Sequence, residues 1–101
     1  KEHREGFHYE FITAQSVAAS TMEMVVLTVM PGARSVPTTT DGYEFKYILA
    51  GTCDYFINEE IVRLESGDAL YFDARKPHMP VNRGMQPVVM LVIYFLSLTG
   101  Q

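Results

Sequence analysis

The chain has 101 residues, of which 48% are hydrophobic and 12% aromatic, so it can build one domain around one core. Twelve acidic and eight basic residues give a net charge of −4, which argues against a nucleic-acid-binding surface on this segment. The longest apolar run, residues 88–96, is too short to cross a membrane as a helix, and no membrane partner is expected. The single cysteine, Cys53, excludes an internal disulfide and favours a reducing, cytoplasmic location. We therefore expect one domain over residues 1–101, in which the charged residues 1–6 are a candidate linker from a preceding region.

The pattern of apolar stretches predicts strands throughout and no helix. In chain order, the predicted strands are residues 7–13, 22–30, 44–50, 53–57, 61–64, 69–72 and 88–96. The turns and loops predicted between them are rich in Gly, Pro, Asp and Asn, and comprise residues 31–32, 41–42, 58–60, 66–68, 73–80 and 83–84. Short strands with this punctuation are typical of an all-β sandwich or barrel.

Several predicted strands are apolar on both faces, most clearly residues 88–95. A sheet with one face in water would instead alternate apolar and polar residues. Both faces of these strands must therefore be covered, one by a barrel interior and the other by a second sheet or another subunit. A symmetric homodimer is the expected solution, and Phe7, Tyr9 and Phe11 add to the apolar surface that it would cover.

Two segments of the chain carry polar residues at a fixed spacing. The first runs from Gly32 to Gly51 and contains Thr38, Thr40 and Glu44. The second runs from residue 67 to residue 82. It contains His78 and ends on Asn82.

Together the two segments resemble the two signature motifs of the cupin family. In that family, histidines stand where this chain has Thr38 and Thr40. In the second motif, Pro and Gly stand where this chain has Asp73 and Arg75. The resemblance covers residues 31–95 and implies a double-stranded β-helix, or jelly-roll, whose outer sheet is completed by the strands before Pro31.

The resemblance also bears on metal binding. In metal-binding cupins, the two histidines and the glutamate of the first motif converge with the histidine of the second inside the barrel. Here Glu44 and His78 are the remaining candidate ligands, since threonine hydroxyls bind such metals poorly. Two protein ligands rarely hold a metal tightly. We expect no cofactor or, if any, a weakly held divalent transition metal. The alternative is that Glu44 and His78 form a buried hydrogen-bonded pair.

A pocket for a small molecule is predicted from the two-residue period of strands. This period places Lys46 and Ile48 on the same face as Glu44. The same counting in the later predicted strands adds Phe72 and Tyr94, if their faces also point inward. The predicted ligand-binding residues are Thr38, Thr40, Glu44, Lys46, Ile48, Phe72, His78 and Tyr94. The alternative is an ordinary filled core. A basic residue near the mouth, such as Lys46, Arg34 or Arg75, would favour a small acid as the ligand, whereas the Met and aromatic content would favour something apolar.

The string from Gly67 to Asp73, followed by Pro77 and His78, is similar to cupin domains that follow an XRE-type helix-turn-helix in bacterial regulators. This resemblance implies a non-enzymatic, effector-sensing domain of a transcription regulator, with DNA bound by a separate N-terminal domain. Two alternatives stay open. One is a metal-dependent cupin enzyme, a dioxygenase or isomerase, and the other is a structural dimerisation module.

Overall fold

The computed structural model describes residues 5–17 and 20–97, and this part of the chain contains eight strands and no helix. The strands are β1 (Phe7–Val17), β2 (Ser20–Val29), β3 (Gly42–Ala50), β4 (Thr52–Ile57), β5 (Glu60–Glu65), β6 (Ala69–Asp73), β7 (His78–Val81) and β8 (Val88–Ser97). The predicted all-β class is therefore confirmed.

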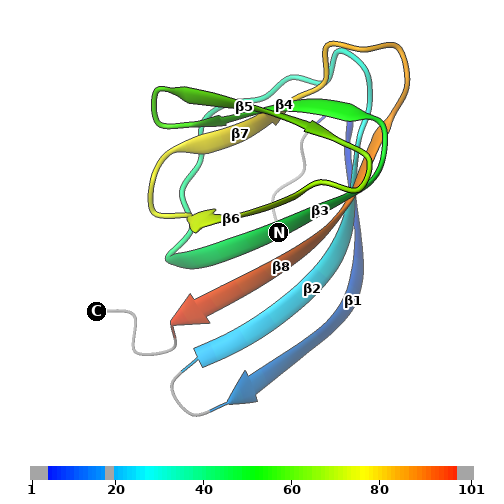
Figure 1. Ribbon diagram of the computed structural model, residues 1–101. Helices are drawn as coiled ribbons and strands as arrows, with labels where there is room; N and C mark the ends of the chain where they lie inside the picture. The colour runs from blue at the N-terminus through cyan, green and yellow to red at the C-terminus, as the bar shows by residue number, and fades with distance from the viewer. Residues whose placement is uncertain (1–4, 18–19, 98–101) are drawn as a thin grey trace.

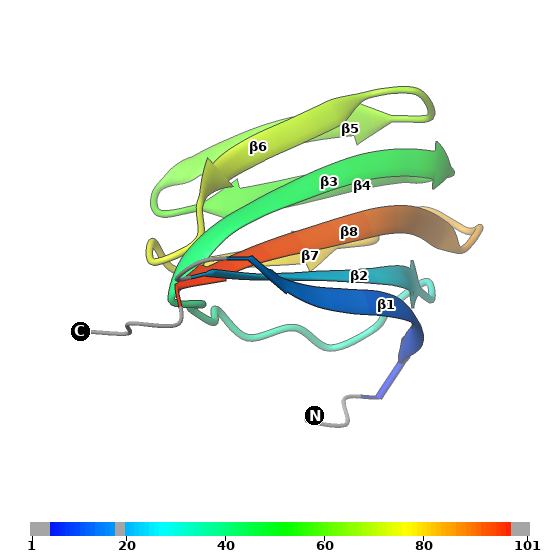
Figure 2. The same cartoon turned by 90° about the horizontal axis from the view of Figure 1, so that it is seen from below.

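The strands form two sheets that enclose the core (Figure 1). The larger sheet has the order β1-β2-β8-β3-β6, and the smaller has the order β5-β4-β7. All neighbouring strands are antiparallel. Seen from below, the long strands β1, β2, β8 and β3 lie side by side and curve together, with the smaller sheet folded over one part of them (Figure 2). This two-sheet arrangement is the expected jelly-roll barrel, and β1 and β2 complete the larger sheet as predicted.

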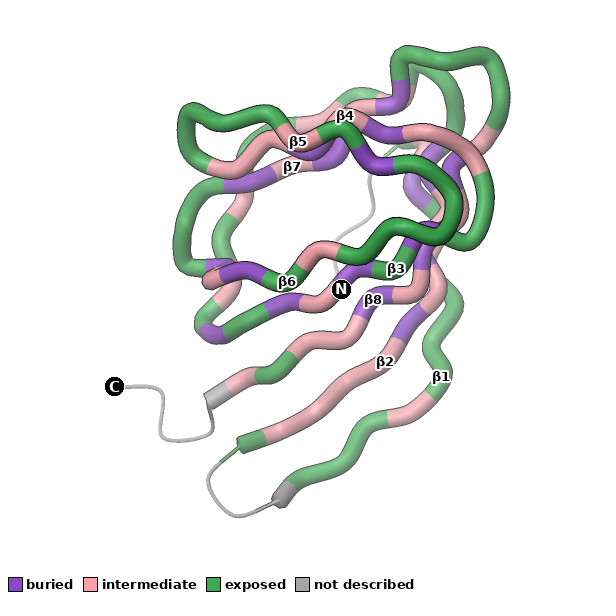
Figure 3. The backbone as a smooth tube through the Cα atoms, in the orientation of Figure 1, coloured by how far each residue is buried: buried purple, intermediate pink, exposed green. Residues whose placement is uncertain are grey.

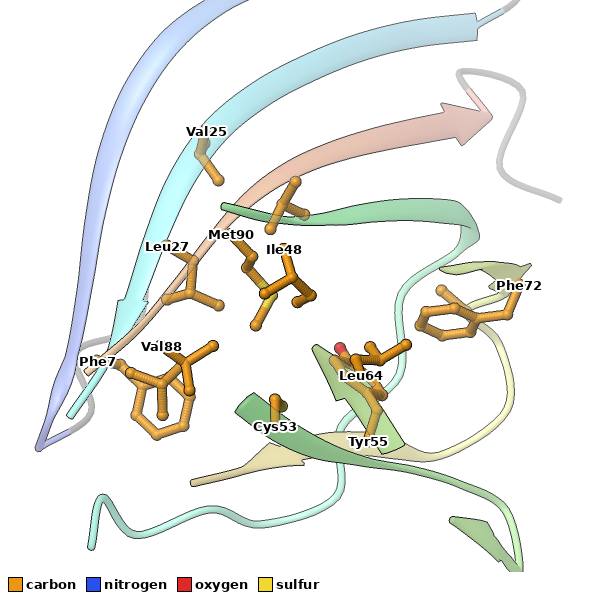
Figure 4. Close-up of a cluster of buried hydrophobic side chains, with 13 residues drawn as sticks. Phe7, Val25, Leu27, Ile48, Cys53, Tyr55, Leu64, Phe72, Val88 and Met90 are labelled. Carbon is orange, nitrogen blue, oxygen red and sulfur yellow. The ribbon is translucent and has the colours of Figure 1, made fainter. Parts of the chain in front are cut away.

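The alternation of side chains along β3 explains how the sheet divides inside from outside. Glu44, Lys46 and Ile48 are buried, whereas Tyr43 and Tyr47 between and beside them are exposed. The inward apolar residues of both sheets meet in one cluster, to which Phe7, Val25, Leu27, Ile48, Cys53, Tyr55, Leu64, Phe72, Val88 and Met90 contribute (Figure 4). The core therefore lies where the smaller sheet covers the larger one.

The buried Cys53 belongs to this core and behaves as a small hydrophobe. It is 1% exposed and unpaired. Burial raises the pKa of its thiol to about 11, so the reactive thiolate is disfavoured at neutral pH.

The loop predicted over residues 73–80 is wrong at its end, because His78 already begins β7. Two prolines made this stretch resemble a loop. Pro80 nevertheless pairs with Tyr55 of β4, at the edge of the smaller sheet, where proline's missing N–H costs no ladder bond. The other strand predictions hold to within a few residues, and the hairpin at Asn58 is present with Ile57 paired to Glu60.

One end of the larger sheet is not covered by the smaller one. The buried residues gather at the end where the sheets overlap, whereas the far halves of β1, β2 and β8 are half-buried or exposed (Figure 3). A pocket between the sheets can therefore open on that side. Within residues 5–17 and 20–97, no helix is long and apolar enough to span a membrane.

Candidate functional site

A cavity of about 520 Å³ lies between the inner face of the larger sheet and the segment of residues 38–40. The wall formed by β1, β2 and β8 is mainly apolar but includes Glu23, and the polar floor comes from β3 and β7. The lining residues are Phe7, Tyr9, Glu23, Leu27, Thr38, Thr39, Thr40, Glu44, Lys46, Tyr55, His78, Pro80, Tyr94 and Leu96. Small-molecule sites typically occupy roughly 300–1,000 Å³ and combine an apolar wall with a few polar groups, as this cavity does.

Three charged or titratable side chains meet on the polar floor. Lys46 Nζ lies 2.8 Å from Glu44 Oε1, and His78 Nε2 lies 3.5 Å from Glu44 Oε2. Apart from this ion pair, Glu44 Oε1 has no hydrogen-bond partner within residues 5–17 and 20–97. The carboxylate is thus balanced in charge but not saturated in hydrogen bonds.

His78 is held in place by its backbone and by one ring nitrogen. Its backbone N–H and C=O pair with Thr38 on the adjacent segment, at 2.9 and 3.0 Å. Its Nδ1 lies 2.8 Å from the carbonyl oxygen of Lys76. A carbonyl only accepts, so Nδ1 is the donor, and Nε2 can donate to Glu44 only when both ring nitrogens are protonated. Phe72 meets the imidazole edge-on at 5.0 Å between centroids, which fixes the ring further.

Lys46 is buried among groups that favour its charged form. Its Nζ lies 5.2 Å from the ring centroid of Tyr55 and 5.8 Å from that of Tyr94, within cation–π range. Burial alone would lower the pKa of the ammonium, but Tyr55, Glu44 and Tyr94 together raise it above its ordinary value. Burial raises the pKa of Tyr94 to about 12, so this phenol stays neutral. The floor therefore carries a permanent cation.

Glu44 is ionised for a related reason. Burial would raise the pKa of its carboxyl, but the contact with His78 and the charge of Lys46 lower it to about 2. Opposite charges within a few ångströms favour the ionised form of both groups. Glu44 and Lys46 thus form a buried pair with almost no net charge.

The structure brings most of the predicted site residues together. Six of the eight line the cavity, namely Thr38, Thr40, Glu44, Lys46, His78 and Tyr94. Ile48 and Phe72 do not line it. Ile48 points the same way as Glu44 but lies deeper, in the packed core, and Phe72 packs against the imidazole of His78. Whether these residues bind a ligand stays a prediction.

Several lining residues were missed by the sequence prediction, above all Glu23, Leu27 and Tyr55. Phe7 and Tyr9 were predicted on the surface that a homodimer would cover, but they line the cavity instead. The two-residue period of β2 carries a usable signal, because Glu23 and Leu27 share the face of the buried Val25. Which face of β2 points inward is nevertheless fixed by its pairing with β8, as in Glu23 opposite Tyr94.

Asp73 and Arg75, the two residues that differ from the second motif, form contacts within the loop and do not line the cavity. Arg75 Nη1 lies 3.2 Å from Asp73 Oδ1, and its Nε lies 3.2 Å from Asp41 Oδ1. Arg75 is half exposed and does not line the cavity, and neither does Arg34. Lys46 is the one Lys or Arg side chain among the described lining residues, and Glu44 neutralises it. The basic mouth that would favour a small acid is therefore not formed by these arginines.

The donor set on the floor does not fit a transition metal. Within the described parts of the chain, no three His, Cys, Asp or Glu side chains gather as ligands would. Thr38 and Thr40 offer neutral hydroxyls, and the Glu44 carboxylate already contacts the Lys46 ammonium. The cavity instead combines a mainly apolar wall with a charge-balanced polar floor.

Comparisons with known proteins agree with this fold. No curated protein matches the chain significantly. The solved structures similar to this chain include the Cupin_2 domain of an XRE family transcriptional regulator from Enterobacter cloacae, with a TM-score of 0.78 and 18% identity, covering 91% of this chain and 97% of that one. They also include a cupin superfamily protein from Desulfitobacterium hafniense, with a TM-score of 0.77 and 16% identity, covering 96% and 84%. The model of the cupin domain family matches residues 25–94, so the chain belongs to the cupin domain family.

Proposed function

We propose that this chain is a small-molecule-binding domain that senses an effector for a transcription regulator, without catalysing a reaction itself. The observation that carries the proposal is the cavity of about 520 Å³, whose floor is the buried pair of Glu44 and Lys46. A purely structural module would have a filled barrel, whereas this cavity has the size of a ligand site.

The regulator part of the proposal is supported by the similar fold of the XRE family domain from Enterobacter cloacae, which this chain matches over 91% of its length. A shared fold alone does not carry function. The string of residues 67–73 followed by Pro77 and His78, which resembles such sensor domains, points the same way. In this proposal, DNA is bound by a separate helix-turn-helix domain.

The charges in the cavity favour an uncharged ligand with an apolar body. Lys46, the cation among the described lining residues, is neutralised by Glu44. An anionic ligand would therefore meet little net attraction. Phe7, Leu27 and Leu96 offer apolar contact, and the half-buried Thr38 and Thr40 can exchange hydrogen bonds with a polar group of the ligand.

The proposal is tested by thermal unfolding of the chain with a panel of metabolites. A ligand that binds only the folded state at about 100 times its Kd stabilises the protein by about 2.7 kcal/mol. We expect at least one compound to raise the Tm of the wild type. Leu96→Trp, which fills the cavity from β8, should abolish this shift.

The matched control is Leu91→Trp, on the same strand but between the inward-facing Met90 and Val92, so that its side chain points away from the cavity. It should keep the shift. A panel without any stabilising compound would favour the structural-module alternative, and turnover of a compound would favour an enzyme.

We also propose that the chain forms a homodimer through the outer face of the larger sheet. Tyr43, Tyr71 and Phe95 are exposed there on three neighbouring strands, and Tyr43 and Tyr71 stack at 5.5 Å between centroids. Asp41, Asp73 and Arg75 lie beside Tyr43, with Arg75 Cζ 5.8 Å from its ring centroid. A patch flanked by both signs of charge can pair with its own copy across a two-fold axis.

A further inference from the structure

The floor of the cavity contains a cation that belongs to the protein itself. Lys46 Nζ lies 2.8 Å from Glu44 Oε1, and the side chains of the two residues are 4% and 2% exposed. In the motif that this chain resembles, the glutamate at this position is a metal ligand. We propose that Lys46 takes the place of a metal ion in this cavity, because its ammonium pairs with Glu44 and excludes a divalent cation from the carboxylate.

The surroundings of Lys46 hold the ammonium where it is. It lies against the rings of Tyr55 and Tyr94 at 5.2 and 5.8 Å, and the chain places it there through the inward alternation of β3. A divalent cation bound to the same carboxylate would lie next to this ammonium. Like charges repel strongly in a buried, low-dielectric site, so the two cations compete for one position.

The residues at the ligand positions of the first motif agree with the replacement of a metal ion by Lys46. Thr38 and Thr40 line the cavity but offer no imidazole, so the chain lacks two donors that a transition metal would require. A carboxylate left without any cation in this buried site would be unstable. Thr38 and Thr40 cannot bind a metal ion in this cavity. Lys46 supplies the positive charge that the metal ion would otherwise provide.

This inference concerns the same cavity as the proposed effector site but does not depend on an effector. It is tested with a metal ion alone, so that a failed metal test and a failed metabolite test are separate results.

The experiment starts from the double variant Thr38→His/Thr40→His, which places two imidazoles at the cavity with Glu44 and His78. Co²⁺ is titrated into the full chain, and its visible absorption reports the coordination. With Lys46 present we expect weak binding. Adding Lys46→Gln should raise the Co²⁺ affinity by about tenfold to a hundredfold, the usual effect of changing a group that touches a metal ligand. Lys46→Met gives a second neutral variant, so that the comparison survives if one of them does not fold.

Two controls separate charge from other effects. Lys46→Arg keeps a cation at this position and should leave Co²⁺ binding weak. Arg63→Gln removes an exposed cation on β5 that does not line the cavity and should change nothing. Equal Co²⁺ affinity with Lys46 and with either neutral substitution would overturn the inference. A tight site in the Lys46→Arg form would overturn it too, because the ammonium would then act by its shape and not by its charge.

Discussion

At the scale of single residues, the buried pair of Glu44 and Lys46 makes the cavity floor sensitive to mutation. Lys46→Met removes the cation and leaves the carboxylate 2% exposed without a counter-charge. We expect a loss of about 3–5 kcal/mol in the free energy of unfolding, measured by urea denaturation. The double variant Glu44→Gln/Lys46→Met should recover much of that loss, because no buried charge remains.

The control for this pair is the exposed ion pair of Arg63 and Asp54, at 3.1 Å with Arg63 64% exposed. Arg63→Gln should cost less than about 1 kcal/mol, as exposed pairs generally do. If Lys46→Met costs no more than Arg63→Gln, the buried pair does not stabilise the fold as argued.

The low pKa of Glu44 predicts a specific acid sensitivity. His78 and Lys46 lower this pKa from 4.5 to about 2, against the effect of burial. A lowered pKa in the folded state gives stability that is complete above the unfolded value and is lost as the pH falls through the folded one. Glu44 should therefore contribute on the order of 3 kcal/mol at neutral pH, and this contribution should disappear between about pH 4.5 and pH 2.

The measurement compares urea denaturation of the wild type and of Glu44→Gln at several pH values. The difference in unfolding free energy between them should shrink across that window and be constant above about pH 6. A constant difference down to pH 2 would mean that the Glu44 carboxyl is not held ionised by the fold.

At the scale of elements, the junction between β3 and β4 depends on Gly51. Its φ is +88°, and a Cβ there would lie 2.6 Å from the carbonyl oxygen of Pro87 and 3.0 Å from Val88 Cα. Gly51→Ala should therefore destabilise the fold by about 2–3 kcal/mol, combining backbone strain with a backbone clash. Gly67 has a similar φ of +92° but open space around it, so Gly67→Ala should cost only about 1 kcal/mol. Equal thermal stability of the two variants would contradict the close approach of the strands at Gly51.

The sequence predicts the elements of this fold better than it predicts the composition of the site. Glu44 and Lys46 were placed on one face by counting along a single strand, which is local information. Tyr9 and Glu23 could not be placed in the same way, because their inward orientation follows from the pairing of β1 with β2 and of β2 with β8. The strand at His78 was missed because its pairing with β4 outweighs the local preference of a proline-containing segment.

At the scale of the whole molecule, the two faces of the larger sheet serve different purposes. Its inner face carries the core at one end and the cavity at the other. Its outer face carries exposed large hydrophobic residues on β3, β6 and β8, namely Tyr43, Tyr47, Leu49, Tyr71 and Phe95. The outward-facing apolar residues form an exposed patch, and contiguous exposed apolar surface commonly marks an interface. An interface on this face would explain why these strands are apolar on both faces.

The homodimer proposed for this outer face leads to the last prediction. Tyr71 is 61% exposed and contacts both Tyr43 and Phe95, with ring centroids 5.5 and 6.2 Å away, so it lies at the centre of the aromatic patch. We expect light scattering to give a dimer mass at tens of micromolar chain. Tyr71→Glu should shift the chain to a monomer, because it buries a charge in an apolar interface. Ile61→Glu changes a similarly exposed residue (60%) on β5 of the smaller sheet, and it should leave the dimer intact. A wild-type monomer, or equal dissociation by both substitutions, would show that the outer face of the larger sheet is not the interface.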